Sequence, residues 1–311
     1  PTVEQLWQEA EQLLDEGEIT LDHYPSACPE IVPDFIANFA ERSEPKTVLD
    51  PWLELGALAA PLLEKLDIER FIGVCSCEEI LELSEQLFSS SQDIKFKLGY
   101  GDQGEYDTEL FDLVISYLPI NGPRRDFEWK GKHLKLPLEV EIAVRSAARL
   151  ADTGIAAYIV PPENLYAQHW ARGRALLQEE GIAELAVFHL PSALLRPFST
   201  ISMYIVILGR DASEAGLFVG EVTEDKSVNA QLLENLRKGK SARLPERGQF
   251  LESKDFIGLP QLISRTKLEN QTKRTKIPRF RLGQIASIKP VTTEPQGSNS
   301  LYIRLGGVPT C

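Results

Sequence analysis

The chain has 311 residues, of which 43% are hydrophobic and 25% are charged, and its formal net charge is −13. This composition is ordinary for a globular protein, and no run of residues approaches the roughly 18 apolar positions of a membrane span. The N-terminal residues are acidic and amphipathic, unlike a secretory signal peptide, so none is expected in this segment. The four cysteines include no CxxC pair and no neighbouring histidine cluster, which favours reduced thiols in a cytoplasmic protein over a zinc site or disulfides.

The charge is divided unevenly along the chain. Residues 1–220 carry 17 basic and 37 acidic side chains, whereas residues 221–311 carry 16 and 9. An acidic body repels the phosphate backbone of a nucleic acid, and a basic tail attracts it. A solvated linker is an equally good interpretation of the tail. The candidate DNA-binding residues in it are Lys273, Arg274, Lys276, Arg279 and Arg281.

Apolar residues spaced three and four apart predict two helices near the start of the chain, over residues 3–14 and 28–42. Strands and helices then alternate. Short apolar runs predict strands at residues 47–50, 71–75, 94–98, 111–116, 154–160, 183–190 and 201–208. Amphipathic runs between them predict helices at residues 56–66, 78–88, 138–150 and 168–180.

Seven strands with intervening helices predict an α/β sheet that is covered on both faces. The last two strands are joined by residues 191–200, which predict a loop because they hold two prolines. A parallel connection needs a longer crossover, usually a helix, so this pair is predicted to be antiparallel. Beyond residue 209 the sequence predicts one more helix at 228–237, followed by a charged, irregular segment.

Two segments about sixty residues apart hold the candidate site. Residues 47–56, TVLDPWLELG, predict a strand, a turn and the start of a helix, and residues 111–120, FDLVISYLPI, predict a strand and the loop after it. In this order they resemble motifs I and IV of the N6-adenine DNA methyltransferases, whose usual forms are DPxxGxG and NPPF or NPPY. Glu54 stands at the first glycine of motif I, and Tyr117-Leu118-Pro119-Ile120 stands in place of NPPF.

Further segments resemble the modification subunits of type I restriction systems, at residues 154–161, 174–191 and 198–208. Together the similar segments cover roughly residues 24–210. The resemblance implies the fold of class I S-adenosylmethionine (SAM)-dependent methyltransferases, a seven-stranded α/β sheet with an antiparallel final hairpin. We therefore expect an N-terminal helical segment at 1–23, a methyltransferase-like domain at 24–220, a helical and basic linker region at 221–278, and the start of a truncated domain similar to a target-recognition domain at 279–311.

The resemblance also implies where SAM would bind, at the carboxyl ends of the strands. Cys75 ends the second strand, where the family has an acidic residue for the ribose hydroxyls, and Glu78 is the candidate substitute. Each of two candidate cofactor residues has another explanation. The Glu78 carboxylate is favourable at the N-terminus of a helix, and Asp102 can belong to a solvated acidic loop. Glu54 would repel the SAM carboxylate. The residues that the resemblance assigns to the cofactor are Pro29, Asp50, Pro51, Gly56, Glu78 and Asp102.

In the family, motif IV supplies an Asn or Asp side chain and a carbonyl that accept hydrogen bonds from the adenine amino group, and an aromatic ring that stacks on the flipped base. Here Tyr117 stands at the acceptor position and Ile120 at the ring position, and only Pro119 is retained. Loss of positioned acceptors is costly for catalysis. The degenerate catalytic positions are Tyr117, Leu118, Pro119 and Ile120.

Three functions are consistent with these residues. The departures from the family fall on the contacts that the chemistry requires while the apolar framework is intact, which favours a degenerate N6-adenine DNA methyltransferase retained for DNA binding or assembly. The alternatives are an active SAM-dependent N6-adenine DNA methyltransferase and a small-molecule methyltransferase, because a fold alone does not fix a substrate. The partners implied are DNA and a specificity or restriction subunit. No metal site is predicted.

Overall fold

The computed structural model describes residues 29–54, 56–88, 93–100, 106, 109–195, 199, 201–210, 216–242 and 245–251. All of them belong to one compact unit. The helix predicted at 3–14 and everything beyond residue 251 lie outside the described residues. No described helix has the length and apolarity needed to cross a lipid bilayer.

The predicted strands are confirmed with small changes at their ends. They are β1 (Thr47–Asp50), β2 (Arg70–Cys75), β3 (Asp93–Leu98), β4 (Phe111–Tyr117), β7 (Leu150–Val160), β8 (Ala183–Leu190) and β9 (Met203–Gly209). The predicted helices correspond to α2 (Ile31–Ala40), α3 (Ala59–Lys65), α4 (Glu78–Leu87), α5 (Leu138–Ala147), α7 (Gln168–Glu179) and α9 (Lys226–Arg237). Short helices that the sequence did not predict are α6 (Pro162–Tyr166) and α8 (Ser192–Leu195).

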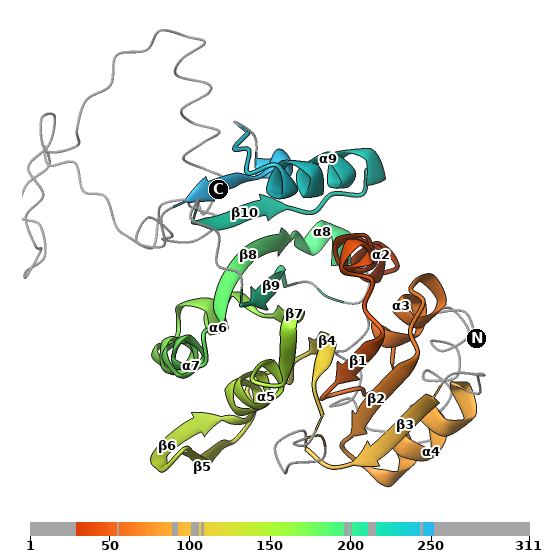
Figure 1. The fold of residues 1–311 in the computed structure, drawn as a ribbon, viewed down its shortest axis with the longest axis vertical. Helices are drawn as coiled ribbons and strands as arrows, with labels where there is room; N and C mark the ends of the chain where they lie inside the picture. The colour runs from red at the N-terminus through yellow and green to blue at the C-terminus, as the bar shows by residue number, and fades with distance from the viewer. Residues whose placement is uncertain are drawn as a thin grey trace, which may run out of the picture. The chain divides into compact units, whose positions relative to one another are not determined.

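Nine strands form one sheet in the order β11-β10-β8-β9-β7-β4-β1-β2-β3 (Figure 1). Strands β7, β4, β1, β2 and β3 are parallel to one another. Strand β9 runs antiparallel to both of its neighbours, β7 and β8, so the predicted antiparallel pair is confirmed. The carboxyl ends of the parallel strands therefore meet at one edge of the sheet, which we call the carboxyl edge.

Four strands were not predicted. Strands β5 (Arg124–Trp129) and β6 (Lys132–Pro137) form a separate hairpin after β4. Strand β10 (Leu217–Glu221) lies parallel to β8, and β11 (Gln249–Leu251) pairs with β10, so the two extend the main sheet. Residues 217–251 thus add strands as well as the predicted helix α9.

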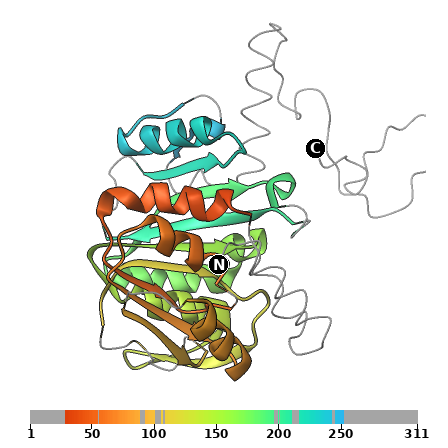
Figure 2. The ribbon, with the colours of Figure 1, turned by 90° about the vertical axis from the view of Figure 1, so that its right-hand side faces the viewer.

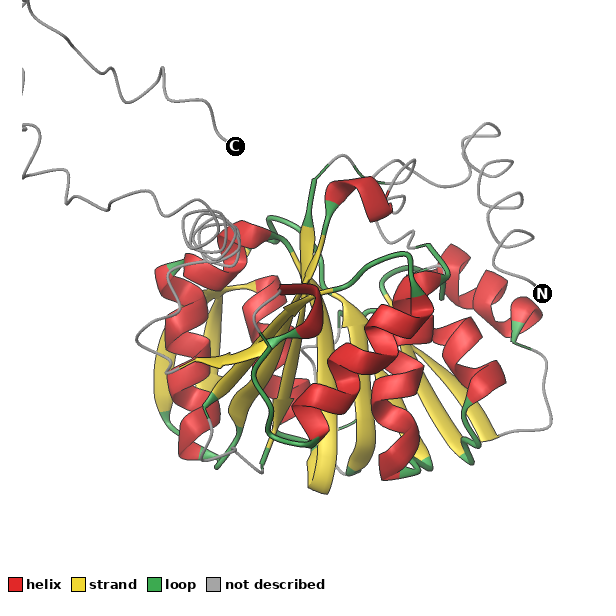
Figure 3. Ribbon diagram, turned by 90° about the horizontal axis from the view of Figure 1, so that it is seen from above, coloured by secondary structure: helices red, strands yellow, loops and turns green. Residues whose placement is uncertain are grey.

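Helices cover both faces of the sheet, as predicted, and lie along its strands (Figure 3). One apolar core joins α2, α3 and α9 to alternate residues of the strands, such as Ile115, Ile159 and Phe188. Figure 2 shows α2 beside α9 on this face. On the opposite face α5 packs against α7, and Gly173 permits their close approach, because a Cβ atom there would lie 2.7 Å from Cγ1 of Val140.

Candidate functional site

Asp50 is the last residue of β1 and links the two sequence motifs. Its carboxylate is 1% exposed, and its Oδ1 accepts hydrogen bonds from the backbone N–H of Trp52 and from Oγ of Ser116, each at 3.1 Å. Burial raises the pKa of the Asp50 carboxyl to about 7, against the opposing effect of these two hydrogen bonds. The structure therefore brings motif I and the strand of motif IV together, as the sequence predicts.

The loop after β1 turns back over β2. The backbone N–H of Leu53 donates to the carbonyl of Val74 at 2.9 Å. Gly56 has a φ of +68°, and a Cβ atom there would lie 2.5 Å from Cζ of Phe88. Glycine at this position thus has a structural reason of its own, because only glycine adopts this conformation without strain and leaves room for the Phe88 ring.

Glu54 occupies the position of the first motif I glycine and keeps a glycine-like backbone. Its φ is +46°, which is unfavourable for a residue with a Cβ atom. Its side chain is 7% exposed, and Oε1 accepts a hydrogen bond from the indole N–H of Trp52. The carboxylate therefore lies inside the protein at this turn, held by a residue of the same loop.

Cys75 ends β2 and is turned into the protein. Its thiol is buried and lies 3.9 Å from Oγ of Ser84 on α4. Burial raises the pKa of the Cys75 thiol to about 12, so the group is neutral. Glu78, the candidate substitute, is exposed in the first turn of α4, where a carboxylate is favoured by the helix dipole.

The motif IV loop begins with a tyrosine that belongs to the core. Tyr117 is 7% exposed and packs among the apolar residues of the α2 and α3 face. Leu118 is buried, and its N–H donates to the carbonyl of Ile159 on β7 at 3.2 Å. Pro119 is half-buried, and Ile120 is 36% exposed. The exposed side chain at the stacking position is therefore aliphatic.

A buried carboxylate anchors the end of this loop. Glu139, in the first turn of α5, accepts a hydrogen bond from the N–H of Gly122 at 3.1 Å. Burial raises the pKa of the Glu139 carboxyl, while hydrogen bonds to backbone N–H groups and the charge of Arg124 act in the other direction. The loop between Tyr117 and Gly122 is thus fixed at both ends.

Three planar side chains come together across the carboxyl edge, and we call them the planar stack: Trp52, Tyr100 and Arg125. The rings of Trp52 and Tyr100 have centroids 6.4 Å apart, and the guanidinium carbon of Arg125 lies 4.9 Å from the centroid of Tyr100. They come from the loop after β1, the end of β3 and the β5–β6 hairpin. Sequence reasoning missed Tyr100, because nothing in its neighbourhood along the chain indicates the two partners.

The remaining predicted residues are spread differently. Pro51 is buried beside Asp50 in sequence, and Pro29 precedes α2, whose first turn contains the bond from the Val32 N–H to the Pro29 carbonyl at 2.9 Å. Asp102 and the basic cluster at 273–281 lie outside the described residues. Within the described part of the chain, no group of three His, Cys, Asp or Glu side chains is placed to hold a metal ion.

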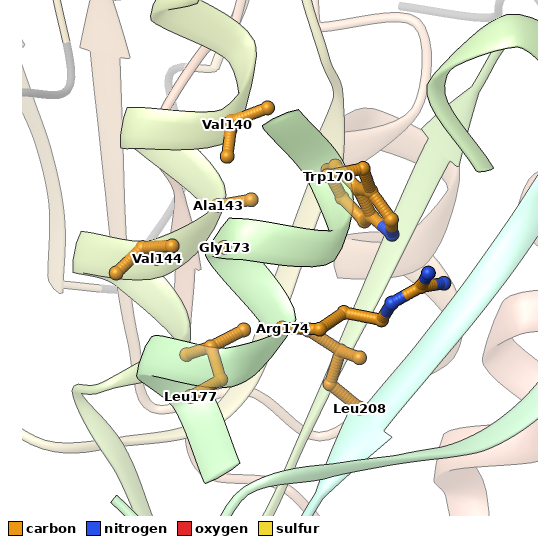
Figure 4. A pocket seen from close by; sticks show the side chains of 8 residues that line it. All are labelled: Val140, Ala143, Val144, Trp170, Gly173, Arg174, Leu177 and Leu208. Carbon is orange, nitrogen blue, oxygen red and sulfur yellow. The ribbon is translucent and has the colours of Figure 1, made fainter. Parts of the chain in front are cut away.

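A small apolar cavity lies away from this site, between α5, α7 and β9 (Figure 4). Its space is sufficient for no more than about one water molecule. Figure 4 shows that its walls are apolar apart from the side chains of Trp170 and Arg174, and both of these bond to Glu184. It is therefore a packing defect between helices rather than a ligand site. Its lining residues are Val140, Ala143, Val144, Trp170, Gly173, Arg174, Leu177 and Leu208.

Solved structures with similar architecture identify the fold. A protein from Listeria monocytogenes assigned to the class I SAM-dependent methyltransferases matches with a TM-score of 0.55 and 17% identity, over 76% of this chain and 79% of that chain. The methyltransferase subunit of a type I restriction–modification system from Streptococcus thermophilus matches with a TM-score of 0.56 and 15% identity, over 69% of this chain. The chain has the class I methyltransferase fold.

A third structure matches the chain with a TM-score of 0.53 and 13% identity, over 90% of this chain. It is a modification subunit assigned to a type I restriction enzyme from Vibrio vulnificus. The chain spans 53% of the Streptococcus subunit and 60% of the Vibrio subunit. No protein-family profile and no curated protein sequence matches the chain.

The methyltransferase fold implies SAM as cofactor, and the described residues do not fit it at two positions. SAM carries a carboxylate, and the loop that would receive it holds the buried carboxylate of Glu54. The ribose hydroxyls need an acceptor after β2, and the buried thiol of Cys75 is a weak one. Asp50 and Gly56 lie at the two ends of the loop after β1, but the chemistry of Glu54 and Cys75 does not match the cofactor.

Proposed function

We propose that this chain is a degenerate relative of the N6-adenine DNA methyltransferases of restriction–modification systems, which keeps the methyltransferase fold without catalysing methyl transfer. It serves in DNA binding or in assembly with a specificity or restriction subunit. The observation that carries this proposal is the buried carboxylate of Glu54 in the motif I loop.

A carboxylate at this position opposes the carboxylate group of SAM, although SAM also carries a positively charged ammonium and a sulfonium. Two unit charges 4 Å apart interact by about 4 kcal/mol at an effective dielectric constant of about 20. Taken alone, a repulsion of that size between the two carboxylates corresponds to nearly a thousandfold in affinity. Because Glu54 is held inside by the indole of Trp52, outward rotation of its side chain would break this hydrogen bond.

Motif IV supports the same proposal. The acceptor position is taken by Tyr117, whose ring is packed in the core, and the stacking position by Ile120, which has no π face. An adenine amino group brought to this loop would find neither the amide acceptor nor the ring that the family uses. Loss of positioned groups of this kind lowers rates by orders of magnitude.

The alternative is an active N6-adenine DNA methyltransferase. The motif I loop supports it, because Asp50 ends β1 beside Ser116 of β4 and Gly56 has a positive φ. In that case Asp50, Gly56 and Asp102 hold SAM, and the 117–120 loop holds the base.

Binding of labelled SAM to matched variants separates the two functions. Glu54→Gly removes both the charge and the unfavourable backbone, whereas Glu44→Gly does the same at an exposed residue with the same φ of +46°. We expect no binding by the unmodified chain or by Glu44→Gly at micromolar SAM, and at least tenfold tighter binding by Glu54→Gly. Transfer of a labelled methyl group to adenine in DNA by the unmodified chain would contradict the proposal.

A further inference from the structure

We propose that the planar stack of Trp52, Tyr100 and Arg125 is a binding platform for the unpaired bases of single-stranded DNA. The inference deepens the proposed function, since it assigns a DNA-binding surface to the described domain itself, apart from the basic cluster at 273–281.

The geometry provides a platform at the surface rather than a buried cluster. The Tyr100 side chain is 40% exposed, and the Trp52 and Arg125 side chains are half-buried. The Arg125 guanidinium lies over the Tyr100 ring at 4.9 Å, and the planes of Tyr100 and Trp52 are tilted by 30°. The three planes thus follow one another across the carboxyl edge, from the hairpin through the end of β3 to the loop after β1.

These side chains have the chemistry that recognises nucleobases without regard to sequence. Unstacked bases stack on aromatic rings and on guanidinium planes, and every base offers such a face. The exposed residue of the motif IV loop, Ile120, offers no π face. The planar stack supplies that face at the same edge of the sheet, from residues that belong to neither motif IV nor the core.

The local positive charge of the β5–β6 hairpin favours a nucleic acid over an uncharged aromatic ligand. The hairpin at 124–137 has five basic and two acidic residues, within a segment of 220 residues that is strongly acidic. Lys130 and Lys132 at the hairpin tip are paired with Glu180 and Glu179 at 2.6 Å. Arg124 is exposed at the hairpin base, next to Arg125, where it can meet a phosphate.

The acidic residues around the hairpin favour a single strand over a duplex. They repel the dense phosphate charge of double-stranded DNA. Bases in a duplex are already stacked on their neighbours, so their faces are closed to the side chains of the planar stack. A single strand brings fewer phosphates and open base faces, and binding then depends on stacking as well as on charge.

The test compares three fluorescently labelled oligonucleotides by anisotropy: a single-stranded oligo-dA, a strand of equal length with abasic residues, and a duplex. We expect the full chain to bind oligo-dA at least tenfold more tightly than the abasic strand, because the two differ only in their bases. Equal affinity for the two strands would overturn the proposal.

Variants assign the binding to the planar stack. Tyr100→Ala and Arg125→Ala are expected to weaken oligo-dA binding by about tenfold each, which is the size of one lost stacking contact. Tyr100→Phe keeps the ring and is expected to bind as the unmodified chain does. Arg125→Lys keeps the charge but loses the plane, and is expected to resemble Arg125→Ala. Unchanged binding by Tyr100→Ala, with an unchanged melting temperature, would overturn the proposal.

The failure of this inference is distinguishable from failure of the proposed function. SAM binding and methyl transfer are measured without the oligonucleotides, and they decide whether the chain is degenerate. Duplex binding that persists while oligo-dA and the abasic strand bind alike would overturn the stacking platform and leave DNA binding through another surface intact.

Discussion

The buried carboxyl of Asp50 makes the stability of the domain depend on pH in a defined direction. Its pKa is raised from 3.8 to about 7 because burial disfavours the charged form. Between about pH 4 and pH 7 the folded protein therefore retains a proton that the unfolded chain has released. The free energy of unfolding is therefore highest below pH 4 and falls as the pH rises from 4 through 7. Above pH 7 the Asp50 titration changes it no further.

The magnitude follows from the size of the shift. A shift of about 3 pKa units corresponds to about 4 kcal/mol of unfolding free energy between the two ends of this window. Asp50→Asn removes the titration, and its amide oxygen can still accept from the Trp52 N–H and the Ser116 hydroxyl. We expect the variant to gain stability relative to the unmodified chain by up to about 4 kcal/mol between pH 4 and pH 8.

Urea unfolding followed by circular dichroism, at intervals from pH 4 to pH 8, measures this difference. Asp126→Asn, exposed on the hairpin, controls for the loss of one negative charge. If the difference between Asp50→Asn and the unmodified chain stays within about 1 kcal/mol over the whole range, the burial of Asp50 and the reasoning built on it are refuted.

Further substitutions test packing and ion pairs by the same unfolding measurement, with Gly131→Ala as a control. Gly56→Ala should lower the free energy of unfolding by more than about 2 kcal/mol, because it adds a steric clash with Phe88 to the backbone strain. Gly131→Ala, where φ is +80° and the space is open, should lower it by about 1 kcal/mol. Equal losses for the two variants would contradict the Phe88 contact. Asp34→Ala, which removes ion pairs from α2 to α3 and α9, should cost about 2 kcal/mol, and no loss would show that these pairs are immaterial. Leu232→Ala should lower the stability of the whole domain by about 2 to 5 kcal/mol, and a separate early transition would instead show that α9 unfolds on its own.

The central sheet was predictable because its strands are short apolar runs bounded by turn residues. Strand β1 was predicted at its observed bounds, and the antiparallel pair of β8 and β9 followed from the absence of a crossover helix. Both inferences rest on the alternation of local patterns along the chain, which tertiary contacts did not override here.

The hairpin of β5 and β6 was missed because charged residues dominate it. Its strands alternate, with Phe127 buried and its neighbours exposed, and its turn at Lys130 and Gly131 has positive φ at both positions. This alternation and the Lys-Gly turn are the signals that could have identified it. Strand β10 was missed because its five residues are too few to show a period of their own.

The sequence predicted where three of the candidate residues lie relative to the strands, but not their contacts. The sequence places Glu54, Cys75 and Tyr117 at the carboxyl edge, and all three are there. That their side chains are buried, Glu54 against Trp52 and Tyr117 in the core, depends on residues distant in the chain or on the path of the loop. The planar stack depends on three segments far apart in the sequence, so no local pattern predicts it.

Calorimetric titration of the unmodified chain with SAM tests the central claim most directly. With the carboxylate of Glu54 buried in the motif I loop, we predict no heat of binding up to millimolar SAM. Saturable binding with a micromolar dissociation constant would show that the loop accommodates the cofactor, and would contradict the account of the chain as a degenerate methyltransferase.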